Sequence, residues 1–304
     1  MVKSYNNLFH GWINLYKDKD LTSNDALRLV KSKFKGSKLG HAGTLDPMAT
    51  GILPIALGEA TKTVPFIHEK NKTYLFAIKF GEQTDTDDAT GKIIGKSDRK
   101  PDINEIKSVL NSYVGPIEQI PPIYSAKKFN GIRSYELARK GVIPDMVSKV
   151  KTIVIENIKL VEMNSDSQCT IEVTCGTGTY IRSISKHIGN KLGLCCHVNK
   201  IERTRYGPFN LKNILSIDRL MQLNHDIDNL NMIISPIETV LDDILAVQIN
   251  NHDANRLRNG SAITFDGNWN GPHSGKVIAK SADKLIAICS LEETQLQPVR
   301  VFNL

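Results

Sequence analysis

The sequence predicts an α/β (α+β) protein in which a mixed, largely antiparallel sheet is followed by a small β-rich module at the C-terminal end. Segments with strand-like alternation and segments with helical periodicity are interspersed, but without the regular alternation that a parallel doubly wound sheet requires. The stretch 246–304 differs, because it consists of short apolar runs separated by turn residues. A chain of 304 residues suits one large domain with a smaller one appended. We therefore expect domains at residues 1–245 and 246–304.

The first expected elements are a helix, a loop and a strand. Thr22 and Asp25 have the spacing of a capping box, and the apolar positions after them share one helical face, which predicts a helix over 22–34. A glycine-containing stretch over 36–58 is expected to be a loop. Alternating aromatic and aliphatic residues over 73–80 then predict a strand with one buried face.

The later elements follow the same two periodicities. Residues 179–192 carry isoleucines at helical spacing, and Gly193 is well placed to end that helix. The other expected elements are a helix over 102–113, strands over 151–162 and 169–175, one or two helices and a connector over 210–245, strands over 276–279 and 285–290, and a turn at 267–271.

Composition and charge favour a globular protein whose surface attracts a polyanion. Hydrophobic residues make up 40% of the chain, which is enough for a core and argues against global disorder. The formal net charge is +7. No apolar run reaches the roughly 18 residues that a membrane span needs, and the first residues lack the pattern of a secretory signal. We expect a cytoplasmic protein with no membrane partner.

The five cysteines are expected to be reduced thiols. Their number is odd, and they form no C-x-x-C pair. Cys195, Cys196 and His197 are contiguous, which is poor spacing for a zinc site. Buried thiols of a cytosolic protein fit this pattern, and no metal site is expected.

Positive charge is concentrated in three stretches of the larger domain. Residues 28–41 hold basic side chains and no acid, residues 124–151 hold seven Lys or Arg against two acids, and residues 182–205 hold six against one. Each stretch is either a solvated face, the usual outcome for a charge run, or a surface that contacts phosphates. Because each stretch lies beside a glycine-rich or aromatic motif, both interpretations stay open: a solvated face and a surface that contacts phosphates.

A lone carboxylate, Asp46, is the candidate chemical group of the segment 40–58. It lies between Leu45 and Pro47 in a stretch whose glycines allow a backbone to approach a ligand closely. A carboxylate there can act as a nucleophile or a base. The alternative is that Asp46-Pro47 only starts a turn, which this dipeptide commonly does.

The pattern G-H-x-G-x-L-D-P-x-A-T-G-x-L, present from Gly40 to Leu53, resembles the bacterial tRNA pseudouridine synthase B family, which modifies the T-loop uridine at position 55. Further blocks follow in the family's order, so that the resemblance extends from about residue 11 to 209. These blocks are Gly58–Lys62, Lys72–Tyr74, Thr84–Gly91, Gln119–Arg139, Gly178–Ser183 and His197–Arg203.

The resemblance implies roles for individual residues. Asp46 would be the catalytic aspartate, Arg182 would pair with it, and Tyr74 would contact the flipped base and is a candidate proton acceptor. The reaction would need no cofactor, and whether Asp46 attacks C1′, attacks C6 or assists removal of the C2′ proton stays open. The substrate-binding and supporting residues would be His41, Tyr180, Ile201, Lys62 and Asp88.

The resemblance also implies how RNA is held. The basic stretch 124–151 aligns with the family's mobile insertion that grips tRNA, and residues 246–304 resemble a PUA-type RNA-binding module. The expected partner is the T-arm of tRNA, bound by a monomer without an obligate protein partner. The side chains expected on the RNA backbone are Lys127, Lys128, Arg133 and Arg139.

One segment departs from the family pattern. The family commonly has Lys-Pro-x-Gly before a Thr-Ser pair, whereas this chain keeps Lys17 and has Asp18 and Asp20 in place of Pro and Gly. The departure puts the geometry of this turn in question. Two alternatives to a tRNA position-55 enzyme also stay open: a related synthase acting on another RNA, and a non-catalytic protein that binds or folds tRNA.

Overall fold

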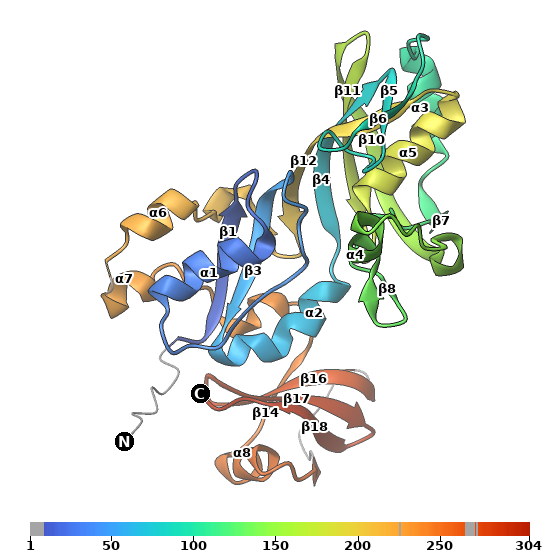
Figure 1. Cartoon of the computed structure of the whole chain (residues 1–304). Coiled ribbons are helices and arrows are strands. Elements are labelled where there is room, and N and C mark those ends of the chain that lie inside the picture. Colours follow the sequence, from blue (N-terminus) through green and yellow to red (C-terminus); the bar gives the residue numbers. More distant parts are fainter. Residues whose placement is uncertain (1–8, 225, 265–270, 272) are drawn as a thin grey trace.

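Two separate sheets organise the molecule (Figure 1). The computed structural model describes residues 9–224, 226–264, 271 and 273–304. The larger sheet has nine strands, and its main path runs in the order β1-β3-β12-β4-β11-β10-β7. Within it every pairing is antiparallel except the short parallel contact between β3 and β12. The prediction of a mixed, largely antiparallel sheet is confirmed.

The strands of the larger sheet come from most of the chain before residue 211. They are β1 (Gly11–Lys17), β2 (Leu39–His41), β3 (Thr50–Leu57), β4 (Lys72–Phe80), β7 (Gly115–Gln119), β10 (Lys151–Ser165), β11 (Gln168–Cys175), β12 (Cys196–Tyr206) and β13 (Phe209–Asn210). Two hairpins project from it: β5 (Glu82–Thr84) with β6 (Ile93–Lys96), and β8 (Lys128–Phe129) with β9 (Ile132–Arg133).

Helices cover the larger sheet and connect its strands (Figure 1). The α-helices are α1 (Ser23–Lys33), α2 (Val64–Glu69), α3 (Ile103–Asn111), α4 (Ser134–Arg139), α5 (Ile181–Leu192), α6 (Ile217–Gln222) and α7 (Ile227–Asn231). Short 3-10 turns are η1 (Gly58–Thr63), η2 (Val147–Lys149), η3 (Leu211–Asn213) and η4 (Ile237–Val240).

Helix ends follow the predicted capping chemistry. The Thr22 side chain accepts a hydrogen bond from the Asp25 N–H, and the Asp25 carboxylate accepts one from the Thr22 N–H, so the capping box before α1 is confirmed. Helix α5 ends at Gly193, whose φ of 66° is easy for glycine and costly for other residues. The expected strand at 73–80 is confirmed as β4, with Tyr74 buried on its inner face.

The expectation of a continuous loop over 36–58 was wrong. That stretch contains β2 and the eight-residue strand β3, which lies between β1 and β12. All residues of β3 except Thr50 are buried, so the strand shows no polar–apolar alternation. A fully buried strand cannot be recognised by a period of two, and the glycines and Pro54 further obscured it.

The C-terminal part forms a five-stranded sheet in the order β14-β16-β17-β18-β15. The expected strands at 276–279 and 285–290 are confirmed within it, whereas a helix there was not expected; the turn expected at 267–271 lies almost entirely outside the described residues. The elements are β14 (Ala246–Gln248), α8 (Asn251–Arg258), β15 (Ile263–Thr264), β16 (Ser274–Ser281), β17 (Lys284–Glu292) and β18 (Gln295–Val301).

The five cysteines are all free thiols, and only Cys195 is not fully buried. In the described part of the chain, no helix is long and apolar enough to cross a membrane.

Candidate active site

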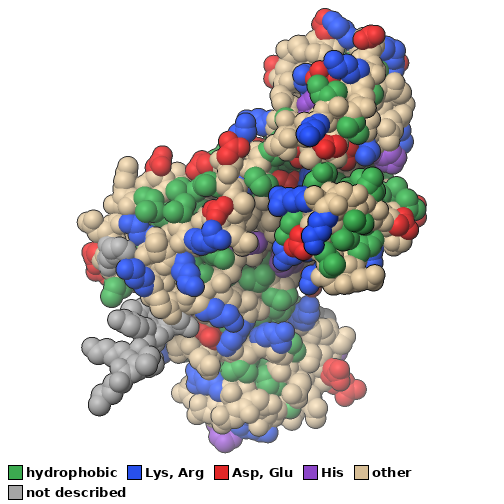
Figure 2. All heavy atoms as spheres, in the orientation of Figure 1, with side chains coloured by type: hydrophobic (Ala, Val, Ile, Leu, Met, Phe, Trp, Pro, Cys, Tyr) green, Lys and Arg blue, Asp and Glu red, His purple; other side chains and the backbone are tan. Residues whose placement is uncertain are grey.

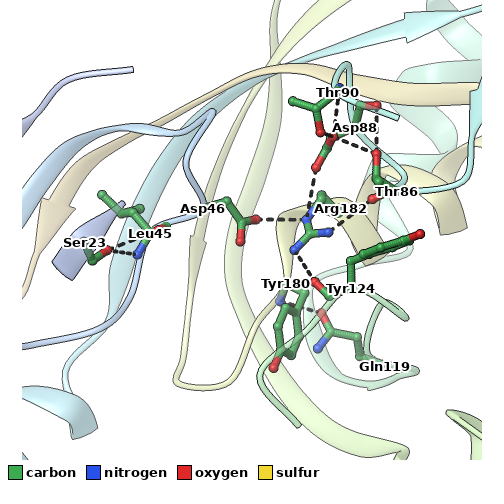
Figure 3. A network of polar contacts seen from close by, with 10 residues as sticks. All are labelled: Ser23, Leu45, Asp46, Thr86, Asp88, Thr90, Gln119, Tyr124, Tyr180 and Arg182. Carbon is green, nitrogen blue, oxygen red and sulfur yellow. Dashed lines mark hydrogen bonds and ion pairs between the residues drawn. The ribbon is translucent and has the colours of Figure 1, made fainter. Parts of the chain in front are cut away.

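Asp46 lies in the segment between β2 and β3, and its neighbours fix the backbone on both sides. The Ser23 hydroxyl, at the start of α1, donates to the Leu45 carbonyl (3.1 Å) and accepts from the Leu45 N–H (2.9 Å) (Figure 3). The Pro47 carbonyl accepts from the Asp20 N–H (2.8 Å) and from the Lys17 ammonium (3.2 Å). With its backbone held in this way, the Asp46 side chain stays 39% exposed and accessible to a substrate.

The turn that contains Asp18 and Asp20 therefore contacts the segment that carries Asp46. Asp20 adopts φ 67°, in the left-handed region where glycine is the usual residue and Asp is tolerated. The Lys17 ammonium is fully buried and also donates to the carbonyls of Asp18 and Leu21. Burial lowers the pKa of Lys17 to about 8, and nearby carboxylates, Asp46 first among them, oppose that shift. The departure from Lys-Pro-x-Gly thus leaves a closed turn that contacts Pro47.

Arg182, in the first turn of α5, is the cation beside Asp46. Its side chain is 5% exposed, and its Nε lies 2.9 Å from Asp46 Oδ2 and 3.7 Å from Asp88 Oδ2 (Figure 3). Among the described residues the Nε–H has no aligned hydrogen-bond acceptor, so the pairing with Asp46 is electrostatic rather than a directed hydrogen bond. Nη1 and Nη2 donate to the carbonyls of Thr86 (3.1 Å) and Tyr124 (3.0 Å), which hold the guanidinium in place.

Asp88 is the second carboxylate of this network, and it is buried and hydrogen-bonded. Its Oδ1 accepts from the Thr86 hydroxyl (2.8 Å), the Thr90 N–H (3.0 Å) and the Thr90 hydroxyl (2.6 Å). These donors leave Oδ2 turned toward Arg182 (Figure 3). The two carboxylates differ, because Asp88 is 7% exposed at its side chain and accepts three hydrogen bonds at Oδ1, whereas Asp46 is accessible.

Tyr74 and Ile201, two further expected site residues, lie on neighbouring strands. Both are buried, and they lie on the antiparallel pair β4–β12, in which Tyr74 is opposite Arg203 and Ile201 is opposite Phe76. Burial raises the pKa of the Tyr74 hydroxyl, while the positive charge of Arg203 opposes that rise. Tyr74 therefore carries its proton at neutral pH, so a role as proton acceptor requires the reaction itself to draw that proton away.

Tyr180 precedes α5 and lies near the same charges. Its backbone N–H donates to the Gln119 side-chain carbonyl (2.8 Å), and the Gln119 amide donates in turn to the Gly178 carbonyl (3.1 Å) (Figure 3). Burial raises the pKa of the Tyr180 hydroxyl, with Asp46 adding to the rise and Arg182 opposing it. The structure thus brings Asp46, Arg182 and Asp88 into one network, with the Tyr180 hydroxyl close enough to feel the charges of Asp46 and Arg182.

Two of the expected site residues, His41 and Lys62, have neighbours other than the carboxylates around Arg182. His41 is at the end of β2; its Nδ1 is buried without a hydrogen-bond partner in the described part of the chain, and burial lowers its pKa. Lys62 forms an ion pair with Glu59 (2.6 Å) and donates to the Val301 carbonyl (2.8 Å). The contacts of Lys62 are therefore with η1 and the C-terminal strand rather than with the carboxylates around Arg182.

The basic insertion lies beside the site as the hairpin β8–β9 followed by α4. Lys128, Arg133 and Arg139 are exposed, and Lys127 is half-buried. The two arginines lie against the ring of Tyr135, at 5.9 and 5.4 Å from its centroid. In the face drawn in Figure 2, Lys and Arg side chains extend from this region down to the C-terminal module.

Within the described residues, no group of three or more His, Cys, Asp or Glu side chains is arranged to hold a metal ion.

Sequence reasoning missed several residues that shape the site. Gln119, Thr86 and Thr90 orient the network through hydrogen bonds, and Arg203 is buried behind the Asp46 segment. All of them lie in the blocks that resemble the synthase family, but no local pattern in the sequence shows which carbonyl or carboxylate each one contacts.

Comparisons with known proteins define the class of enzyme to which this fold and site belong: the pseudouridylate synthases. Residues 31–181 match the N-terminal domain of TruB family pseudouridylate synthase, and residues 182–242 match the tRNA pseudouridylate synthase B C-terminal domain. The chain belongs to the TruB family of tRNA pseudouridine synthases. Its activity is an intramolecular isomerisation, as the sequence predicted.

The similarity to individual relatives spans almost the whole chain. The tRNA pseudouridine synthase B of Caulobacter vibrioides is 40% identical over 302 residues, covering 97% of this chain and 96% of that protein. The Ehrlichia canis protein of the same name is 36% identical over 299 residues, covering 97% and 98%. Among solved structures, the archaeal box H/ACA sRNP Nop10-Cbf5 complex contains a chain with TM-score 0.73 and 22% identity, covering 98% of this chain and 87% of that one. At that identity the match shows the fold alone.

Proposed function

We propose that this enzyme isomerises the T-loop uridine at position 55 of tRNA to pseudouridine, with Asp46 as its essential carboxylate. The observation that carries the proposal is the pairing of an accessible Asp46 with a buried Arg182, 2.9 Å away. We assign Tyr74, Tyr180 and Ile201 to the same site, where Asp46 acts on the pKa of both tyrosines. A carboxylate in this setting is oriented by the guanidinium while one side remains open for the reacting nucleotide.

The reaction requires the uridine to leave the RNA stack. An extruded base loses its stacking partners, and aromatic and branched aliphatic side chains such as Tyr180 and Ile201 offer faces that replace them. His41 lies on β2, just before the Asp46 segment, where we expect it to occupy the space that the turned-out nucleotide leaves.

The chemical step then breaks the N-glycosidic bond, rotates the uracil and joins C5 to C1′ of the ribose. The rearrangement releases a proton from C5 and places one on N1, and the Tyr74 hydroxyl is the proposed relay for the proton from C5. Attack of Asp46 on C1′, attack on C6 and assistance to C2′ deprotonation all use the ionised carboxylate. The buried position of Tyr74 and Ile201 supports retention of the cleaved base, since release would leave an abasic site.

Binding away from the reacting nucleotide is assigned to the basic surface. Lys127, Lys128, Arg133 and Arg139 would contact phosphates of the T-arm, which position the RNA without reading its sequence. The module at 246–304, in which we infer a PUA-type role, would extend this surface. We infer a cytoplasmic monomer that needs no obligate protein partner.

The test is incubation with an unmodified tRNA transcript, followed by mapping of pseudouridine at single-nucleotide resolution. The expected result is conversion at the T-loop uridine and at no other position. An Asp46→Asn variant is the matched control, and a transcript with cytidine at position 55 controls for site choice. Conversion at a different uridine would favour a related synthase with another target, and binding without conversion would favour a tRNA-binding protein that lacks activity.

A further inference from the structure

Arg203, on β12, is a buried cation whose hydrogen bonds go to the segment that carries Asp46. The residue is 1% exposed. Its Nε donates to the Ile52 carbonyl (2.7 Å), and its Nη2 donates to the Gly43 carbonyl (2.9 Å). Gly43 precedes Asp46 and Ile52 follows it, so one guanidinium is bonded to the chain on both sides of the carboxylate.

The two glycines of this segment are pressed against the same strand. Gly51 has φ +104°, and a Cβ there would lie 2.3 Å from the Arg203 carbonyl oxygen and 2.7 Å from its nitrogen. Gly43 has φ +66°, and a Cβ there would lie 2.9 Å from Tyr206 Cε1 and 3.3 Å from Arg203 Nη1. Only glycine permits this approach at either point, because its missing Cβ leaves room and its backbone tolerates positive φ.

Two tyrosines are the other neighbours of Arg203. Arg203 is directly opposite Tyr74 in the β4–β12 ladder, and its guanidinium lies 4.9 Å from the ring centroid of Tyr206. In the described part of the chain no carboxylate lies within ion-pair distance of Arg203. Its charge is balanced by carbonyl dipoles and an aromatic face, which is a costly arrangement to bury and a rigid one once formed.

We propose that Arg203 is a positioning residue, which fixes the segment 43–52 against the strand that carries Tyr74 and so sets where Asp46 lies relative to Tyr74. The fork of the guanidinium is essential to this role, since two donors with fixed geometry reach two carbonyls at once. A lysine keeps the charge but presents a single point donor, and a methionine fills similar volume with no donor. The effect on turnover rests on the proposed function; the effect on the segment does not.

The experiment compares Arg203→Met and Arg203→Lys with the wild type, and uses Arg205→Met as the matched control. Arg205 is on the same strand and exposed, and its side chain donates locally, to the Gly207 carbonyl (3.1 Å). Three quantities are measured: amide hydrogen exchange by segment, the dissociation constant for an unmodified tRNA transcript, and the single-turnover rate at saturating enzyme.

In both Arg203 variants we expect faster exchange confined to the segment 43–52. The rate of Arg203→Met should fall by about 10²-fold, the effect expected when a reacting group shifts by about 1 Å. Arg203→Lys should lose less, and tRNA affinity should stay near that of the wild type. Because Arg203→Lys keeps the buried charge, this variant can still be measured if Arg203→Met fails to fold.

Three results would overturn the proposal, and the first two are unchanged exchange over 43–52 in the Lys variant and faster exchange there without loss of rate in an active enzyme. A loss spread evenly over the sheet, with affinity falling in parallel, would show a general structural role and overturn it as well. If the wild type itself forms no pseudouridine, the proposed function fails, and the exchange data alone still decide whether Arg203 fixes the segment.

Discussion

Two buried arginines contact the Asp46 segment, and they balance their charges differently. Arg182 faces two carboxylates, with its Nε 2.9 Å from Asp46 and 3.7 Å from Asp88. Arg203 bonds to the carbonyls of Gly43 and Ile52. An arginine that pairs with carboxylates takes part in the electrostatics of the reacting group, whereas one that bonds to carbonyls determines the course of the backbone. The first region should therefore control chemistry and the second geometry.

The strongest test of the Arg182 region is Asp46→Asn. The amide is nearly isosteric with the carboxylate, so the fold and tRNA binding should survive while turnover is abolished. Pseudouridine formation and tRNA affinity are measured in parallel. Activity above a few per cent of the wild type would remove Asp46 from the chemical step.

Tyr74→Phe separates the hydroxyl of that residue from its ring. If the hydroxyl transfers a proton, the single-turnover rate should fall by roughly 10²–10⁴ with near-normal tRNA affinity. Tyr113→Phe is the matched control, because Tyr113 is also buried and its hydroxyl has no hydrogen-bond partner in the described residues. Full activity of the Tyr74 variant would leave that residue only a contact with the base.

The sequence predicted the network around Arg182 better than the one around Arg203. Asp46, Asp88 and Arg182 are charged residues in distinctive blocks, and the structure places Arg182 2.9 Å from Asp46 and 3.7 Å from Asp88; their roles in catalysis stay predictions. Arg203 was part of a predicted block without a role, since its partners are backbone carbonyls that leave no trace in side-chain identity. Backbone positions also depend on tertiary contacts, as the missed strand β3 shows, because its complete burial removes the alternation from which strands are predicted.

A third prediction extends the comparison to the insertion. Replacing Lys127, Lys128, Arg133 and Arg139 together should weaken tRNA binding and flatten its dependence on salt. Each neutralised phosphate contributes a slope of about 0.7 to 0.9, so the change should be around two to four units. The rate at saturating tRNA should change less than the affinity, because phosphate contacts position the RNA without touching the base. Affinity is measured over a salt series, and identical slopes would show that this stretch is a solvated face.

The smallest expected effect belongs to Lys62, whose contacts contrast with the site role that the resemblance implied. Its ammonium donates to Val301 and pairs with Glu59, while the Glu59 carboxylate also accepts from the Asn303 N–H (2.8 Å). The Lys62→Met variant removes one charge-assisted bond and one partly exposed ion pair, so unfolding should become easier by about 1–2 kcal/mol. The single-turnover rate at saturating tRNA should match the wild type. Denaturant unfolding and turnover are measured together, with the exposed Lys284 changed to Met as control. A rate loss at unchanged stability would return Lys62 to the active site, because a link between η1 and the C-terminal strand has no other way to affect the chemical step alone.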